Sequence, residues 1–251
     1  MFREYFILLL LAHIVSDFYI QTEKMARKKE ESINWVILHC LSYWLTTIGV
    51  SLPVMSWEVF KFGSMAAITH LIIDVMKYAY VLKIKKKVEI TMLKERNIFL
   101  VDQILHVFCL TAIAYLFVLK VGKLNLCDSA LEFFTIVGIP GTIMVSWITA
   151  LLIIHKPANI TISKLLMLYR PEEREDNKKH RNSAGRSIGS LERIMILIFI
   201  SIGQYSAIGL VLTAKSIARY DRISKERDFA EYYLLGTLIS TAVAIIVSFI
   251  I

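Results

Sequence analysis

Ionisable residues recur four positions apart in otherwise apolar stretches of this chain. The pairs occur in HIVSD, HLIID and, in reverse order, DQILH: His13 with Asp17, His70 with Asp74, and Asp102 with His106. A separation of four residues places two side chains on one face of a helix, about one turn apart. A further histidine, His39, lies in another apolar stretch. A charged group inside a bilayer costs about 3 kcal/mol or more, so ionisable residues there indicate a functional site.

Imidazole and carboxylate groups together predict a metal site. These donors suit zinc, iron or manganese, and a divalent cation would offset the buried negative charge. We expect a divalent metal ion, with zinc as the first candidate, bound by His13, His39, His70, Asp74 and His106. Asp17 and Asp102 are the expected catalytic carboxylates. Seven candidates exceed one tetrahedral site, so either two metals bind or some residues act through the ligands. The alternative is a set of His–Asp hydrogen bonds that join helices.

Three polar neighbours are candidates for support of these ligands. Gln21 and Gln103 either donate hydrogen bonds to them or lie at the water interface. Lys77 is three residues from Asp74, so it either neutralises that carboxylate or extends its ammonium group to the aqueous side.

The elements that carry these residues are long apolar segments. The chain has 251 residues, of which 56% are hydrophobic and only 4 are proline, and its mean hydropathy is +0.59. A membrane-spanning helix needs roughly 20 mainly apolar residues. We therefore predict an all-α, polytopic membrane protein with about seven transmembrane helices. The segments are 4–21, 33–53, 59–81, 98–120, 133–154, 191–214 and 232–251.

The same pattern predicts four regions. Residues 1–122 would form a four-helix membrane domain with the His/Asp pairs, and residues 123–154 a fifth apolar helix that either spans or is re-entrant. Residues 155–190 are predicted to form a charged cytoplasmic loop, and residues 191–251 are predicted to form a membrane region of two helices. The cysteines show no paired spacing, so we expect no disulfide framework.

The positive charge is concentrated in the connections between segments. The net charge is +8, and the first and third connections are rich in lysine and arginine. This distribution is typical of cytoplasmic loops, so we expect the N-terminus outside a cell (inner) membrane, with membrane lipids and no nucleic acid as partners. On this count the His/Asp pairs lie toward the cytoplasmic leaflet. The basic connection 215–227 conflicts with the count unless segment 133–154, interrupted by GIPG, is re-entrant.

The motifs also resemble a known family. AHIVSDFYIQTEKMA, THLIIDVMK and FLVDQILH resemble the bacterial membrane-protein family of domain of unknown function 3307, and AGRSIGSLERIMILIFISIGQYSAIGLVLTAKSIAR resembles the C-terminal membrane extension of many members. The resemblance implies a multi-spanning membrane protein and no particular reaction.

Three functions fit these observations. The first is a metal-dependent hydrolase that acts on a lipid or another membrane-embedded substrate. The second is a proton- or ion-coupled transporter that uses the His/Asp layer as a relay. The third is a non-enzymatic scaffold or regulator, in which GRSIGSLER and AKSIARYDRISKER dock a cytoplasmic protein partner or anionic lipid.

Overall fold

The protein is helical throughout the part that the structure describes. A computed structural model describes residues 1–86, 91–171 and 178–251, with the side chains of residues 178–184 left out. About 85% of the chain is helical, and these described ranges contain no strand. The all-α prediction is therefore confirmed. The chain divides into two compact units, residues 1–149 and 150–251, which are described separately.

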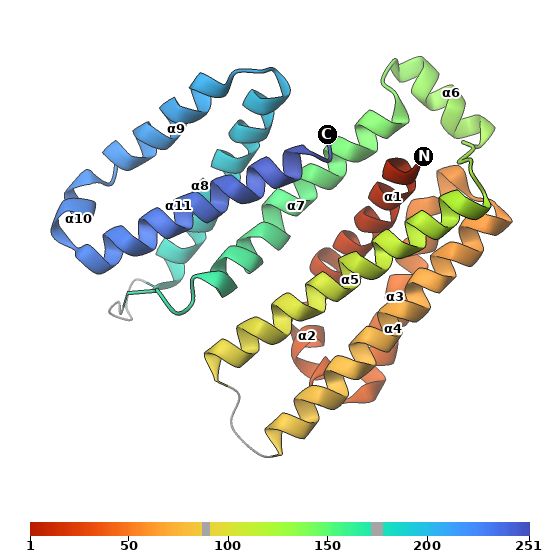
Figure 1. Ribbon diagram of the computed structural model, residues 1–251, viewed down its shortest axis with the longest axis horizontal. Helices are drawn as coiled ribbons and strands as arrows, with labels where there is room; N and C mark the ends of the chain where they lie inside the picture. The colour runs from red at the N-terminus through yellow and green to blue at the C-terminus, as the bar shows by residue number, and fades with distance from the viewer. Residues whose placement is uncertain (87–90, 172–177) are drawn as a thin grey trace. The chain divides into compact units, whose positions relative to one another are not determined.

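The first unit is built on a ring of four helices. Its elements are α1 (Phe2–Ile14), the π-helical η1 (Val15–Ile20), α2 (Glu23–Lys29), α3 (Ile33–Ser51), the 3₁₀ turn η2 (Leu52–Val54), α4 (Trp57–Lys85), α5 (Met92–Lys120) and α6 (Asp128–Val137). Helix α1 packs against α3 and α5, and α4 packs against the same two helices, which closes the ring (Figure 1).

Short polar residues fix where several of these helices begin. The side chains of Thr22, Ser56 and Thr91 accept hydrogen bonds from backbone N–H groups at the starts of α2, α4 and α5. Such N-caps satisfy donors that a helix otherwise leaves unpaired. The connections between the long apolar helices therefore end at defined residues.

One end of the ring is filled by an apolar core. Tyr5 stacks on Phe117 with ring centroids 3.9 Å apart, and Phe62 meets Phe117 edge to face. The other buried members are Leu8, Leu9, Val59, Ala66, Leu110, Ile113 and Ala114. On α1 and α4, these core residues come before the ionisable pair in the sequence. On α5, which runs in the opposite direction, they come after it. The ionisable residues therefore occupy the opposite half of the bundle.

The first helix changes its winding where its aspartate lies. After Ile14 the backbone continues as the π-helix η1, and the helical stretch Phe2–Ile20 then meets α2 at an angle of 97°. A π-helical turn is rare and is frequently found at functional sites. Residues 1–30 contain no proline or glycine, so the sequence does not predict this change of winding.

Helix α7 (Gly141–Leu165) begins in the first unit and continues into the second. The second unit also contains α8 (Lys178–Ser201), α9 (Tyr205–Ile217), α10 (Tyr220–Lys225) and α11 (Arg227–Ser248). Helix α8 packs against α9 and α11. Its small apolar core consists of Ala150, Ile154, Leu197 and Val247.

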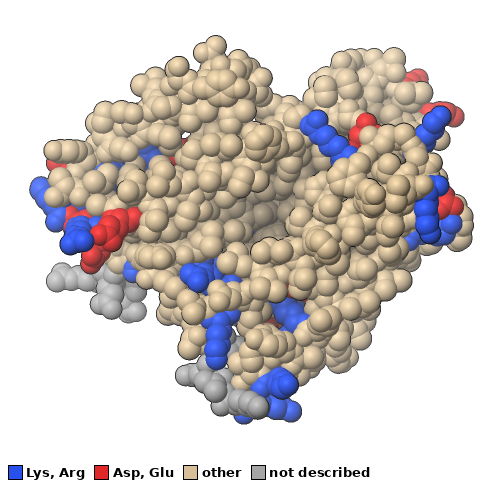
Figure 2. Space-filling model, viewed as in Figure 1, with Lys and Arg blue, Asp and Glu red and all other residues tan. Residues whose placement is uncertain are grey.

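Five helices of the described chain are long and apolar enough to cross a membrane. They lie at Ile33–Val54, Trp57–Lys85, Met92–Lys120, Gly141–Leu165 and Arg227–Ser248. The bent pair of Phe2–Ile20 and Glu23–Lys29 supplies a sixth if it counts as one span. On the visible face, most charged side chains lie near helix ends and the helix sides are largely uncharged (Figure 2). A multi-spanning membrane protein is thus supported, whereas the count of seven is not confirmed.

Two predicted segments differ from the helices observed. Segment 191–214 is divided, because α8 ends at Ser201 and Gly203 turns the chain at a φ of 72° before α9 begins. In segment 133–154, Gly138 also has a φ of 72°, a conformation that glycine adopts at little cost. Helix α7 begins after this break and continues to Leu165, beyond residue 154.

Candidate metal centre

The seven predicted ionisable residues gather inside the four-helix ring. All of their side chains are at least nine-tenths buried, and Asp17, at 9% exposure, is the most accessible. They come from every helix of the ring: His13 from α1, Asp17 from η1, His39 from α3, His70 and Asp74 from α4, and Asp102 and His106 from α5. The spacing of four residues therefore turns both members of each pair inward.

Two histidine nitrogens meet two carboxylates at the centre of this cluster. His39 Nε2 and His70 Nε2 lie 3.1 Å apart. Asp17 Oδ1 lies 3.3 and 3.6 Å from these two nitrogens. Asp74 Oδ2 lies 3.7 and 3.5 Å from them. In a tetrahedral zinc site with bonds near 2.0–2.1 Å, neighbouring ligand atoms are about 3.3–3.4 Å apart. The observed separations bracket that value.

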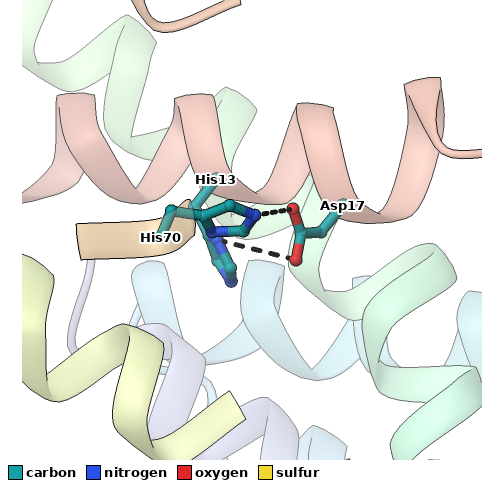
Figure 3. Close-up of side chains that lie close together, drawn as sticks. All are labelled: His13, Asp17 and His70. Atoms are coloured by element: carbon teal, nitrogen blue, oxygen red, sulfur yellow. Dashed lines mark ion pairs between the residues drawn. The ribbon is translucent and has the colours of Figure 1, made fainter. Parts of the chain in front are cut away.

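A further histidine, His13, approaches Asp17. His13 Nδ1 lies 3.9 Å from Asp17 Oδ2, and Figure 3 shows the rings of His13 and His70 on one side of the Asp17 carboxylate. One ligand atom from each of His13, Asp17 and His70 lies within 4.8 Å of the others. The same holds for His39, His70 and Asp74. The cluster therefore offers overlapping sets of donors.

Two lysines neutralise two of the three aspartates. Lys29 Nζ lies 2.6 Å from Asp74 Oδ2, and it reaches this carboxylate because α2 folds back after the bend. Lys77 Nζ lies 2.8 Å from Asp102 Oδ2. Within the described residues, Asp17 has no such lysine or arginine and faces only histidines. The negative charge of Asp17 is thus the one that a bound metal cation would neutralise.

Of the three predicted supporting residues, two contact a carboxylate, and Gln21 contacts a lysine that does. Gln21 Oε1 accepts a hydrogen bond from Lys29 Nζ at 3.1 Å. Gln103 Nε2 donates to Asp102 Oδ2 at 3.2 Å. Lys77 binds Asp102 on the neighbouring helix, although it shares its own helix with Asp74. All three therefore lie at the edge of the cluster.

His106 is oriented like a metal ligand. Its Nδ1 lies 2.8 Å from the backbone carbonyl oxygen of Asp102, a distance at which an Nδ1–H donates and Nε2 keeps its lone pair. That Nε2 is buried and has no hydrogen-bond partner among the residues described. Metal-bound histidines usually hold their second ring nitrogen by a hydrogen bond of this kind.

Several other buried polar atoms are left without hydrogen bonds of good geometry. Across the described residues these include Asp17 Oδ1, Asp102 Oδ1 and both ring nitrogens of His13. Buried polar atoms normally have partners, and each exception needs an explanation. A cation among these donors supplies one, so the residues present fit a bound divalent metal ion.

Sequence reasoning missed some members of the cluster. Tyr43 stacks on His70 with ring centroids 3.9 Å apart and planes 13° apart, and Cys40 Sγ lies 3.8 Å from Asp74 Oδ2. Tyr43 lies four residues after His39 on the same face of α3, so helical spacing could have found it. Cys40 directly follows His39 and does not share its face, so that spacing could not have found Cys40. Lys29 could not be found this way, because its approach depends on the bend before α2.

Fold and cluster together define a multi-spanning helical membrane protein with a buried His/Asp centre. The family model described as "Protein of unknown function (DUF3307)" matches residues 5–135, just over half of the chain and all seven residues of the cluster. The chain belongs to this family, as the resemblance predicted. No curated protein and no solved structure matches the chain.

Proposed function

We propose that the protein binds one divalent metal ion, zinc by its donor set, and uses it to hydrolyse a lipid or another membrane-embedded substrate. The observation that carries the proposal is the convergence of His39 Nε2, His70 Nε2 and Asp17 Oδ1, separated by 3.1–3.6 Å. Three protein ligands with a position left for water are the arrangement of a catalytic zinc site. This assignment makes Asp17 a ligand in place of the free base expected from sequence.

The balance of charge supports a single metal ion. Three carboxylates meet two lysines in the layer, and the lysines take Asp74 and Asp102. With neutral histidines, one negative charge remains, at Asp17. A second divalent ion would leave a large uncompensated positive charge in a buried layer, which is costly. In this proposal His13 and Asp74 would complete or adjust the coordination of one ion.

Residues on α5 would handle the proton in this reaction. Asp102 Oδ1 has no hydrogen bond among the described atoms, while its other oxygen is held by Lys77 and Gln103. A carboxylate fixed in this way with one open oxygen can accept a proton from water. A bound zinc ion supplies the complementary chemistry by lowering the pKa of its water. His106, held by the backbone of α5, lies beside His70 with ring centroids 4.3 Å apart.

The orientation expected from charge would open this layer toward the cytoplasmic leaflet. The substrate would then approach from the end of the bundle where α2, the end of α4 and the start of α5 lie. The apolar core at the other end excludes water from that side.

The experiment that tests the proposed reaction separates metal binding from turnover. Purified protein in phospholipid vesicles is supplied with zinc or with a chelator, and hydrolysis products are measured by mass spectrometry. Products should appear only with zinc. The Asp102→Asn variant should retain the metal and lose at least about 100-fold in rate, as expected for removal of a general base. Equal turnover in chelator, or full activity in Asp102→Asn, would refute the assignment.

A proton- or ion-coupled transporter is the second candidate. The specific observation in its favour is the chain of contacts from Lys29 through Asp74 and the histidines to Asp17. The stacked Tyr5 and Phe117 oppose it, since they fill the remaining half of the bundle without a polar path among the described side chains. Flux that depends on pH in vesicles, lost in Asp74→Asn, would favour this function over hydrolysis.

A further inference from the structure

The second unit contains a cavity that the His/Asp centre does not use. Its volume is about 740 Å³, and all of its lining residues belong to residues 150–251. Helices α7, α8, α9, α10 and α11 each contribute to the wall. The volume is within the range of roughly 300–1,000 Å³ that small-molecule sites occupy.

The lining of this cavity is strongly cationic. Within the described part of the chain, the lining contains no aspartate or glutamate. It contains six basic residues: Arg170, Arg186, Arg193, Lys215, Arg219 and Arg222. Arginine guanidinium groups bind phosphate and carboxylate oxygens in pairs of parallel hydrogen bonds. Arg222 and Lys215 already pair with Glu226 and Glu192, so the fit to an anion rests on Arg193 and Arg219.

The innermost of these cations is buried and has no carboxylate partner among the residues that the structure describes. Arg193 is 2% exposed, and its Nε donates to the backbone oxygen of Ile154 at 2.9 Å. Its Nη atoms donate to Ser240 Oγ at 3.0 Å and to Asn159 Oδ1 at 2.6 Å. All of these acceptors are neutral. A buried charge is costly unless it is paired, so an anion in the cavity would complete the environment of Arg193.

The neighbouring acidic residue is already engaged. Glu192 Oε2 lies 2.5 Å from Lys215 Nζ, which also donates to Thr237 Oγ1 at 3.3 Å. This pair is neutral as a unit. The net positive charge at the base of the cavity therefore belongs to Arg193.

A glycine leaves room for the side chain of this arginine. A Cβ atom at Gly189 would lie 3.3 Å from Arg193 Nη1, tighter than most contacts of a real Cβ. Apolar side chains complete the lining, and they include Ile162, Leu166 and Phe229. The cavity thus combines a cationic base with an apolar wall.

We propose that this cavity binds an anionic amphiphile by its phosphate group, with a membrane phospholipid of the phosphatidylglycerol type as the source. The phosphate lies against Arg193 and Arg219, and the apolar chain follows the side of Ile162 and Leu166. Basic pockets between membrane helices bind anionic headgroups by this combination of charge and apolar contact.

The test measures lipid retention on the full chain in neutral detergent. Dioleoyl phosphatidylglycerol and dioleoyl phosphatidylcholine are titrated separately, and bound lipid is counted by native mass spectrometry. Arg219→Gln and Arg186→Gln remove cations at two different walls. The control is Arg227→Gln, because Arg227 is 89% exposed in the same unit and does not line the cavity.

One phosphatidylglycerol should be retained per chain, with about tenfold weaker binding in Arg219→Gln or Arg186→Gln and no change in Arg227→Gln. Equal retention of phosphatidylcholine would overturn the proposal, and so would an equal loss in Arg227→Gln. Inorganic phosphate forms a separate arm. If millimolar phosphate alone protects the protein against heat as well as the lipid does, the ligand is a soluble phosphate and the amphiphile assignment is wrong.

Discussion

The ion pair between Lys29 and Asp74 tests how charge is balanced in the polar layer. Its atoms lie 2.6 Å apart, and the two side chains are only 12% and 2% exposed. The Lys29→Met variant removes the cation and leaves a buried carboxylate without its partner. Breaking a buried pair in this way costs about 3–5 kcal/mol. In a unit of about this size we expect the Tm to fall by on the order of 10 °C.

The assay is thermal unfolding in neutral detergent with a chelator present. The double variant Lys29→Met/Asp74→Asn should regain most of the loss, because the unpaired charge has gone. Lys24→Met is the matched control, since Lys24 is exposed on the same helix. Its effect should be within about 0.5 kcal/mol. Zinc should stabilise Lys29→Met more than the unmodified protein, because the layer then carries additional negative charge.

Two results would refute this reasoning. A Lys29→Met protein as stable as Lys24→Met would show that the contact contributes nothing to folding. A double variant no more stable than Lys29→Met alone would show that the loss comes from packing and has no connection with the Asp74 charge.

The remaining predictions concern other parts of the first unit and its metal. Phe117→Ala should cost about 3–5 kcal/mol through a cavity in the apolar core, measured by thermal unfolding, while bound metal stays unchanged; a loss of metal would contradict the separation of the two halves. The Ser129 hydroxyl, and after it the backbone N–H of Ala130, lower the pKa of the Cys127 thiol, so a membrane-impermeant maleimide should label Cys127 at half its maximal rate at a lower pH than a free cysteine; equal pH profiles would argue against these contacts. By the expected orientation, labelling should occur from outside intact cells, and exclusive labelling from inside would reverse the topology. Removal of metal by chelator should lower the stability of the unmodified protein by about 2.7 kcal/mol relative to zinc at 100 times its dissociation constant, and identical melting curves would contradict a bound ion.

The sequence predicted the helical fold and the members of the cluster because both depend on local periodicity. The four-residue spacing of His70 and Asp74 turns both inward on any α-helix. Comparable depth in four apolar segments then brought these pairs to one layer. The break at GIPG was also visible, since Gly138 and Pro140 interrupt a helix.

Other features depend on contacts that a local pattern does not encode. The π-helical turn at Asp17 has no glycine or proline to mark it, and Lys29 reads as one more basic residue in a connection. The buried state of Arg193 likewise follows from acceptors on α7 and α11, far away in the sequence. These are tertiary effects, which composition and spacing cannot supply.

The most direct test of the central claim is the metal content of the purified protein. Elemental analysis by mass spectrometry should find about one zinc ion per chain after preparation in zinc-containing buffer without chelator. Lys24→Met should keep this content, and Asp17→Asn should lose it while circular dichroism shows an unchanged helical fold. A folded protein without a transition metal, or an Asp17→Asn variant that retains the full content, would contradict the account.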